Sequence, residues 1–426
     1  MEQKLIAAID VGTTKIVVIV GEKTENNKFN ILQLAYEPSK GIEKGNVVNI
    51  NDTVEAIRNV LNKLNPMGEL LFDSVYLGIA GQHMITKFNS KELLIQSEQQ
   101  HTITENDVKR MEEAAENTEC DADNEIIGAI PISYIIDGTK TLKDPIDFIC
   151  NKSLKANFLL IYAKKTKVNS LKQCIYNNNL KIKGLFIEPF AASEAVLLPE
   201  EKKSCVAMVD IGGGTSDLAV YENNKMIFSA IIPLGGNIIT NVIKEQFGLF
   251  ENHAEQIKKE VGLTYGDESR VFTNKTTGEK IPINDVAKII KHKYEEIFAA
   301  ILYQLISINY REKIKTLVIT GGGALTKNLR QLANYCTTYD IRIAVPSDKI
   351  IGNFKTTLSD PIFSTAVGLI ILGNKYEEKN QQTKQLDTQT IIENNSNDQN
   401  KNEDDKQEKK GLKKFLIDIF KDVIID

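Results

Sequence analysis

Short apolar runs separated by polar turns fill the first part of the chain. Three of them are KLIAAIDVG (4–12), KIVVIVGE (15–22) and FNILQLAYEP (29–38). They are rich in β-branched residues and are divided by glycine and asparagine turns, which is typical of strands joined through tight turns. The pattern predicts three consecutive β-strands at the start of the fold.

The apolar period then changes to that of a helix. Within residues 52–64 the apolar side chains recur every three or four positions, and Asp52 stands where an N-cap is expected. Because SVYLGIA (74–80) has the composition of another strand, the first unit is predicted to be β-β-β-α-β. The apolar helix positions are Val54, Ile57, Val60, Leu61 and Leu64.

A similar unit begins about 200 residues later, at Cys205. It consists of CVAMVDIGGG (205–214), TSDLAVYE (215–222) and KMIFSAIIPLGG (225–236). An aspartate again stands at the first turn. A repeat of this kind predicts two related halves that face one cleft.

The end of the chain has a different pattern. Residues 393–410 contain no aliphatic or aromatic side chain, so they cannot offset the entropy of ordering, and we predict a disordered linker over 375–410. Residues 411–426 then become amphipathic, with lysines at their start. The apolar face of this predicted helix consists of Leu412, Phe415, Leu416, Ile419, Phe420, Val423 and Ile424.

This terminal helix is expected to lie in a membrane interface. About fifteen helical residues span about 22 Å, which is too short for a hydrocarbon core about 30 Å thick. An interfacial position buries the apolar face, and the basic start (Lys413 and Lys414 among others) attracts anionic lipid. The alternative is a helix that docks on its own body or on a partner protein.

Composition narrows the class of protein. The 426 residues exceed one ordinary domain, and the net charge of -5 gives no indication of nucleic-acid binding. Five cysteines without CxxC spacing and four histidines without ligand spacing indicate no metal or disulfide framework. No apolar run reaches the length of a membrane span, so we expect a cytosolic protein with peripheral membrane contact.

Three glycine-rich turns carry the candidate chemistry. Glycine lets backbone N–H groups approach phosphate, threonine hydroxyls add donors, and aspartate at a strand end can hold Mg²⁺ through water. Each turn alone could be an ordinary hairpin, but all three follow an apolar strand. No P-loop or GxGxxG motif is present. The turns contain Asp10, Gly12, Thr13, Thr14 and Lys15; Asp210, Gly212, Gly213, Gly214 and Thr215; and Gly321, Gly322 and Gly323.

These motifs resemble those of the actin, Hsp70 and sugar-kinase superfamily. Glu188-Pro189-Phe190-Ala191-Ala192 is similar to its first connecting helix and Ala366-Val367-Gly368-Leu369 to its second. The resemblance implies catalytic roles for Glu188, which would polarise a water, and Asp210; Glu188 could instead be a carboxylate stabilised at a helix N-terminus. It also implies nucleotide contacts for Gly236, Glu255 and Lys258, the last two being otherwise a solvated pair.

Within the superfamily the chain resembles the FtsA family of cell-division proteins. About fifteen residues (38–52) separate the third strand from the first helix, so the domain that actin and MreB insert there has no room. A block of roughly 75 residues follows residue 82 instead, as in FtsA. Strings similar to that family are GIAGQHM (78–84), IPISYIIDG (130–138), IPLGGNIITN (232–241), ITGGGALTKNL (319–329) and the terminal helix.

The resemblance implies an α/β actin-like ATPase fold of duplicated ribonuclease-H-like halves. The resemblance divides the chain into seven consecutive segments. They are 1–82, first half; 83–157, inserted subdomain; 158–198, return to the first half with a connecting helix; 199–345, second half, with a smaller subdomain at about 241–290; 346–374, closing helix; 375–410, linker; and 411–426, membrane helix.

The function implied by the resemblance is that of a cell-division adaptor. Such a protein binds ATP and Mg²⁺, hydrolyses ATP slowly at most, self-associates into filaments, and links the C-terminal peptide of FtsZ to anionic lipid on the cytoplasmic face of the inner membrane at the division site. It also recruits later division proteins. The alternatives are a pilus-assembly adaptor like PilM, which lacks the terminal helix, and a small-molecule kinase, for which no substrate constellation is evident.

Overall fold

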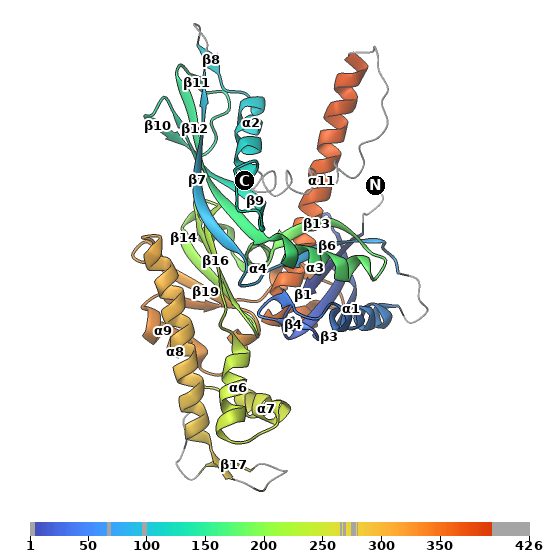
Figure 1. Ribbon diagram of the computed structural model, residues 1–426, viewed down its shortest axis with the longest axis vertical. Helices are drawn as coiled ribbons and strands as arrows, with labels where there is room; N and C mark the ends of the chain where they lie inside the picture. Colours follow the sequence, from blue (N-terminus) through green and yellow to red (C-terminus); the bar gives the residue numbers. More distant parts are fainter. Residues whose placement is uncertain are drawn as a thin grey trace.

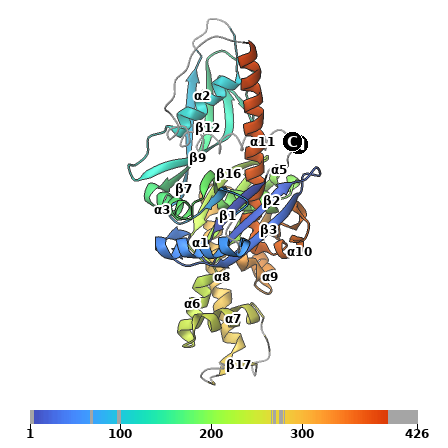
Figure 2. The ribbon, with the colours of Figure 1, turned by 90° about the vertical axis from the view of Figure 1, so that its right-hand side faces the viewer.

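Two α/β halves lie side by side, and a third unit projects from them (Figure 1). The computed structural model describes residues 5–393 apart from 66–69, 96–99, 265, 267–269, 274–277 and 279. In Figure 2 the projecting unit extends from one end of the molecule and a pair of helices, α6 and α7, from the other.

The first half contains a six-stranded sheet that confirms the predicted strands. β1 pairs antiparallel with β2 and parallel with β6, and β2 pairs antiparallel with β3. The apolar runs form strands because both faces of the central strands are buried. The order is β13 (Lys181–Ile187), β6 (Ser74–Ile79), β1 (Ile6–Val11), β2 (Lys15–Lys23), β3 (Phe29–Pro38) and β21 (Ile350–Ile351).

The predicted first helix is present but begins earlier than expected. α1 spans Ile50–Leu64, and the Asn49 side chain accepts a hydrogen bond from the backbone N–H of Asp52. Asn49 is therefore the N-cap, and Asp52 lies in the first turn, where its charge favours the helix dipole. A short hairpin, β4 (Ile42–Glu43) and β5 (Asn46–Val47), precedes this helix.

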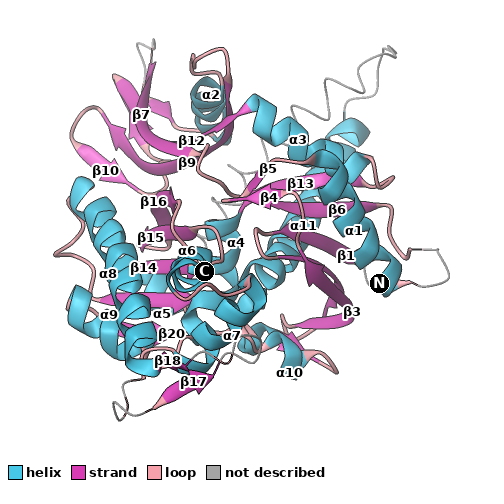
Figure 3. Cartoon of the chain, turned by 60° about the horizontal axis from the view of Figure 1, so that its bottom comes forward, coloured by secondary structure: helices cyan, strands magenta, loops and turns pink. Residues whose placement is uncertain are grey.

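The second half repeats the first. β14 and β15 form the same antiparallel hairpin as β1 and β2, and β14 pairs parallel with β19 as β1 does with β6. Figure 3 shows the two sheets as separate groups of strands. The order is β16 (Lys225–Ile232), β15 (Ser216–Glu222), β14 (Cys205–Ile211), β19 (Thr316–Thr320) and β20 (Asp340–Ile343).

Two helices pack against each other where the halves join. α4 (Glu188–Val196) and α11 (Ser364–Glu393) touch so closely that a Cβ on Gly368 would lie 1.7 Å from the carbonyl oxygen of Ala191. The remaining helices of the halves are α3 (Lys165–Tyr176), α5 (Pro199–Lys203), α6 (Gly236–Gln246), α7 (Glu251–Val261), α8 (Ile283–Ser307), α9 (Leu329–Thr337) and α10 (Lys355–Leu358). Three 3₁₀ turns are η1 (Gly322–Leu325), η2 (Ser347–Lys349) and η3 (Pro361–Phe363).

The inserted subdomain ends later than the sequence pattern predicts. Its four-stranded sheet has the order β10-β9-β12-β7, and β12 (Ser153–Lys164) pairs with β9 as far as Lys164. The boundary placed at 157 was wrong because one uninterrupted strand carries the chain back to the first half. The other elements are β7 (Ile85–Leu94), β8 (His101–Thr102), α2 (Glu105–Glu116), β9 (Asn124–Ile136), β10 (Lys140–Leu142) and β11 (Ile149–Cys150).

The smaller subdomain of the second half also differs at its edges. It begins with α6 at Gly236 and continues through α7 and the hairpin of β17 (Val271–Thr273) and β18 (Lys280–Pro282). α8 then runs without a break from Ile283 to Ser307. The boundary expected near 290 lies inside this helix, which returns the chain to the five-stranded sheet.

The closing helix continues well beyond the predicted start of the linker. α11 extends to Glu393, so the disorder predicted for 375–393 was wrong. Beyond residue 374 the Tyr76 hydroxyl donates to Glu377, and Lys23 pairs with Glu378. These contacts and the helix-forming Glu, Lys and Gln residues extend the helix. Residues 394–426, including the predicted membrane helix, lie outside the described residues.

Candidate functional site

The two glycine hairpins have the same closed geometry. The Gly12 N–H donates to the Lys15 carbonyl at 3.0 Å, and the Gly212 N–H donates to the Thr215 carbonyl at 2.9 Å. Each turn ends the first strand of its half, so the repeat in sequence becomes a repeat in structure. The two turns therefore present equivalent backbone surfaces to the space between the halves.

The hairpins face and contact each other across this space. A Cβ on Gly213 would lie 2.1 Å from Cγ2 of Thr14, and a Cβ on Gly214 would lie 2.6 Å from Oγ1 of Thr13. Glycine is thus required at both positions by the opposite hairpin rather than by its own turn. Two threonine hydroxyls are thereby brought next to two glycine backbones.

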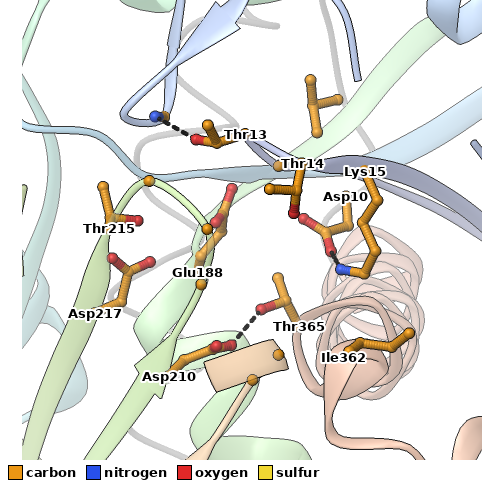
Figure 4. A pocket seen from close by; sticks show the side chains of 18 residues that line it. Asp10, Thr13, Thr14, Lys15, Glu188, Asp210, Thr215, Asp217, Ile362 and Thr365 are labelled. Carbon is orange, nitrogen blue, oxygen red and sulfur yellow. Dashed lines mark hydrogen bonds and ion pairs between the residues drawn. The ribbon is translucent and has the colours of Figure 1, made fainter. Parts of the chain in front are cut away.

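A polar cleft lies between these hairpins (Figure 4). Both phosphate-loop candidates and most of the third glycine turn contribute to its wall. The lining residues are Asp10, Val11, Gly12, Thr13, Thr14, Lys15, Gly45, Glu188, Asp210, Gly212, Gly213, Gly214, Thr215, Asp217, Gly321, Gly322, Ile362 and Thr365.

Four carboxylates come together in the cleft. Asp10 and Asp210 are the penultimate residues of β1 and β14. Asp217 is the second residue of β15, and Glu188 begins α4. Lys15 is the nearby cation, with Nζ 3.6 Å from Oδ2 of Asp10. Among the described residues, Oδ1 of the buried Asp217 has no hydrogen-bond partner. The cleft therefore places four acidic side chains close to one another and to Lys15.

Burial, with neighbouring carboxylates as a further cause for three of the four groups, shifts their pKa values upward. Burial raises the pKa of Asp210 to about 6, with Lys15 acting in the opposite direction. Burial also raises the pKa of Asp10, partly offset by Lys15. Burial and the neighbouring carboxylates, Asp10 first, raise the pKa of Glu188 well above its usual value. Burial, then Asp210, does the same to the pKa of Asp217. A cation in the cleft would reverse these shifts.

The donor set fits hydrated Mg²⁺ together with a polyphosphate. Carboxylate oxygens are ligands that Mg²⁺ accepts, and the unpartnered Asp217 oxygen can receive a hydrogen bond from a metal-bound water. Within the described part of the chain no group of three His, Cys, Asp or Glu side chains could hold a metal ion by itself. The metal would therefore depend on water and phosphate oxygens for most of its coordination.

The closing helix and the third glycine turn position Asp210. The Thr365 hydroxyl donates to Oδ2 of Asp210 at 3.1 Å. Gly321, with φ +83°, approaches so closely that a Cβ there would lie 2.0 Å from Oδ1 of Asp210. Gly321 and Gly322 line the cleft, whereas Gly323 packs against Ile211 and its carbonyl accepts from Tyr294.

The three remaining candidates lie together behind the second hairpin. Lys258 Nζ donates to the Gly236 carbonyl at 3.1 Å and pairs with Glu255 Oε2 at 2.6 Å. The Gly236 N–H in turn donates to the Gly212 carbonyl at 2.9 Å. None of the three is among the residues that line the cleft, but each is connected to it through the hairpin backbone. The pair is largely buried at Lys258, with 13% of that side chain exposed, so it is not simply solvated.

Sequence reasoning did not select five of the lining residues, which are Val11, Gly45, Asp217, Ile362 and Thr365. Gly45 belongs to the β4–β5 hairpin, where its N–H donates to Oγ1 of Thr13 at 3.0 Å. Ile362 and Thr365 precede the helix motif, and neither has a local signature. Asp217 did have a local sequence signature, because it ends the run DIGGGTSD, and its side chain lines the same cleft.

The solved structures that this fold resembles define its class. The PilM protein of the PilM–PilN type IV pilus biogenesis complex matches with a TM-score of 0.65 at 17% identity, covering 86% of this chain and 98% of that one. MreB 5 of Spiroplasma citri bound to AMPPNP matches with a TM-score of 0.54 at 13% identity, covering 90% and 100%. The chain therefore has the actin-like ATPase fold.

Sequence comparisons then identify the family. The model of cell division protein FtsA matches residues 207–368, and that of the SHS2 domain inserted in FtsA matches 81–162. Cell division protein FtsA of Neisseria meningitidis is 30% identical over 88% of this chain and 92% of its own, and that of Bacillus subtilis is 30% identical over 86% and 83%. The chain belongs to the FtsA family of cell division proteins. This membership favours the cell-division prediction over the pilus and kinase alternatives.

Proposed function

We propose that this actin-like cell-division protein binds Mg·ATP in the cleft between its halves. The observation that carries the proposal is the pair of glycine hairpins in mutual contact, beside four carboxylates that share the cleft with Lys15. A triphosphate bound by both hairpins would hold the halves together, and Mg²⁺ would relieve the crowding of charge.

Each group of lining residues would bind a different part of Mg·ATP. The hairpin backbones around Gly12 and Gly212, with the hydroxyls of Thr13 and Thr14, would hold phosphate oxygens, and Lys15 would neutralise part of their charge. Asp10 and Asp210 would hold Mg²⁺ through water. Gly321 and Gly322 would let the adenosine approach the backbone. Gly236, Glu255 and Lys258 would support the second hairpin from behind.

Glu188 is proposed to orient a water molecule for hydrolysis rather than to bind the nucleotide. Its carboxylate begins α4, and a Cβ on Gly78 would lie 3.1 Å from its Cγ, so the adjacent strand limits where it can move. The raised pKa makes it a stronger proton acceptor when it is ionised. When Mg·ATP is bound, the metal ion supplies charge neutralisation, and Glu188 can orient a water. Hydrolysis is expected to be slow at most.

The nucleotide site serves an adaptor in this proposal. The protein self-associates and tethers the FtsZ ring, through the C-terminal peptide of FtsZ, to anionic lipid on the cytoplasmic face of the inner membrane. Later division proteins join it there. Family membership and the amphipathic pattern of 411–426 support these roles. Within the described residues no helix is long and apolar enough to cross a membrane.

Flotation with liposomes tests the adaptor role. Full-length protein should carry purified FtsZ to the top of a gradient with anionic vesicles, and a chain lacking 411–426 should leave both at the bottom. Phe415→Glu should also release the protein, because it places a charge on the apolar face. Asp418→Lys, on the polar face, should retain or tighten binding.

Two results would contradict this assignment. Unchanged flotation of the truncated protein would locate the anchor elsewhere. Flotation of the full-length protein without FtsZ in the same fraction would leave the membrane anchor intact and remove the proposed partner.

A further inference from the structure

The inserted subdomain is attached to both halves of the molecule. Its chain leaves the first half after β6 and returns at α3, so the first half holds it covalently. The second half holds it through contacts of β16 with β7 and β9. β16 is the edge strand of the five-stranded sheet, and Figure 1 shows it beside β7 and β9. The subdomain therefore covers an edge that would otherwise be open.

Lys225 is the central residue of this contact. It lies on β16 and is 4% exposed, yet its Nζ donates to the carbonyl oxygens of Ile132, at 3.2 Å, and Lys143, at 2.9 Å, both in the inserted subdomain. The Tyr134 ring lies 5.8 Å from the same atom. A buried amine loses its hydration, so these two carbonyls must replace water. Any shift of the subdomain away from β16 would break both bonds.

Two further contacts support the lysine. The Thr86 hydroxyl of β7 donates to the Ser229 carbonyl of β16 at 2.6 Å. The Ile132 side chain packs against the cores of both halves. The junction thus combines directional hydrogen bonds with apolar packing, which fixes the subdomain relative to the second half.

The same sheet carries the second glycine hairpin. β16 pairs with β15 over its whole length, and β15 begins at Ser216, immediately after that hairpin. A movement of the hairpin and its Asp210 is therefore a movement of Lys225 as well, because the sheet between them is continuous. Lys225 and the second glycine hairpin therefore belong to one continuous sheet.

The first half also connects the cleft to the subdomain. Gly45 donates its N–H to the Thr13 hydroxyl, and Oδ1 of the neighbouring Asn46 lies 2.8 Å from Nδ1 of His83. The Asn46 amide donates to the Lys44 carbonyl, so its oxygen faces His83, and Nδ1 of His83 is the donor. His83 lies where the chain enters the subdomain. Each attachment of the subdomain is thus one element away from a phosphate-loop candidate.

We propose that Lys225 is a latch through which the second half sets the orientation of the inserted subdomain, so that nucleotide-driven rotation of the halves turns the subdomain. The nucleotide dependence rests on the proposed Mg·ATP binding. Gly368 of α11 packs tightly against the backbone of Ala191 of α4 where the halves join, and this contact is the pivot of the proposed rotation. The subdomain is joined to the first half by its two chain connections and is held to the second half through Lys225, so a change in the angle between the halves must change its orientation relative to the first half.

Distance measurements between spin labels test the latch. One label is placed on the exposed Cys120 of the subdomain and one on α1 of the first half through the exposed Glu55→Cys, with Cys205→Ser and Cys336→Ser to prevent side reactions. Distances are measured by pulsed electron paramagnetic resonance without nucleotide and with Mg·AMPPNP. Calorimetry of the same samples records nucleotide binding.

Lys225→Met should broaden the distance distribution without nucleotide and abolish the shift that Mg·AMPPNP causes in the parent protein. The matched control is Lys143→Met, which removes an exposed charge beside the latch but keeps the accepting carbonyl, and it should behave as the parent. Thr86→Val should give a smaller broadening and replaces Lys225→Met if circular dichroism shows that variant to be unfolded.

The outcomes separate the latch from the proposed function. Absence of nucleotide binding in the parent protein would contradict the Mg·ATP site, and the broadening without nucleotide would still decide whether Lys225 orients the subdomain. A Lys225→Met distribution as narrow as that of the parent would overturn the latch. Nucleotide binding without any shift in the parent would overturn the coupling.

Discussion

At the residue scale, the carboxylates that would bind a cation in the cleft also destabilise the fold when no cation is bound. Four carboxylates share a cleft with one nearby lysine, and Asp217 leaves an oxygen without a partner in the described structure. Like charges and unpaired buried groups destabilise a fold. Such an arrangement persists where a ligand relieves it, which is the argument for a cation and a polyphosphate here.

The cost of burying Asp210 can be measured as a change in the free energy of unfolding with pH. Burial raises the pKa of Asp210 to about 6 in the folded protein. An unfolded aspartate titrates near 3.9. The folded state therefore holds the proton more tightly, and this group alone should lower the free energy of unfolding by about 2 kcal/mol as pH rises from about 4 to above 6 without nucleotide.

Asp210→Asn should lose most of this decline and should weaken Mg·ATP binding at neutral pH. Chemical denaturation across pH measures the first effect, and calorimetry with and without Mg²⁺ measures the second. Unchanged affinities for both ATP and Mg²⁺ would exclude Asp210 from the site.

Glu188 should affect turnover more than binding. A residue that orients water acts mainly in the transition state, so Glu188→Gln should keep ATP affinity within a few-fold while slowing phosphate release. Single-turnover hydrolysis and calorimetry give the two quantities. Equal losses in both would indicate that Glu188 has a structural role at the start of α4. Since the test needs turnover, it applies where the parent protein hydrolyses ATP measurably.

At the scale of elements, the edge strand β7 is the candidate contact for the next molecule in a filament. It is the outer strand of its sheet, and Phe88 and Leu94 are 59% and 66% exposed. Exposed apolar side chains on an edge strand favour association with another chain. Phe88→Glu should therefore abolish filaments on lipid while leaving ATP binding unchanged.

Electron microscopy of lipid monolayers checks this prediction, and Glu105→Gln on α2 of the same subdomain is the control. Filaments of normal abundance in Phe88→Glu would show that the contact uses another surface. This substitution is preferable to deleting the subdomain, because Ile130 and Leu159 of the subdomain are part of the main core.

At the scale of the whole molecule, membrane binding should depend on self-association. One short amphipathic helix is a weak anchor, whereas a filament presents many tethered helices at high effective concentration. Recruitment to anionic vesicles should therefore rise steeply with protein concentration in the parent and only gradually in Phe88→Glu. Co-sedimentation over a concentration series measures both curves, and identical gradual curves would contradict the avidity mechanism.

Local pattern was sufficient for a large part of this protein. Apolar runs between turns predicted β1 to β3 and the repeat that begins at β14, and a helical apolar period predicted α1, since these elements depend on side chains near one another in sequence. The glycine runs identified both hairpins because a close backbone approach requires glycine wherever it occurs. The amphipathic pattern of 411–426 likewise gives a prediction that stands on sequence alone.

Contacts between segments far apart in sequence were decided only by the tertiary structure. Thr365 reaches Asp210 across 155 positions, and Gly45 joins the cleft through a hairpin too short to have a periodic signal. α11 continues past residue 374, where Tyr76 and Lys23 contact it from the first sheet, and these contacts come from segments far away in sequence. Lys225 is one lysine among many in sequence, and only the carbonyls of a folded subdomain give it a function. A sequence specifies local periods directly, but burial, charge crowding and long-range hydrogen bonds exist only once the chain has closed on itself.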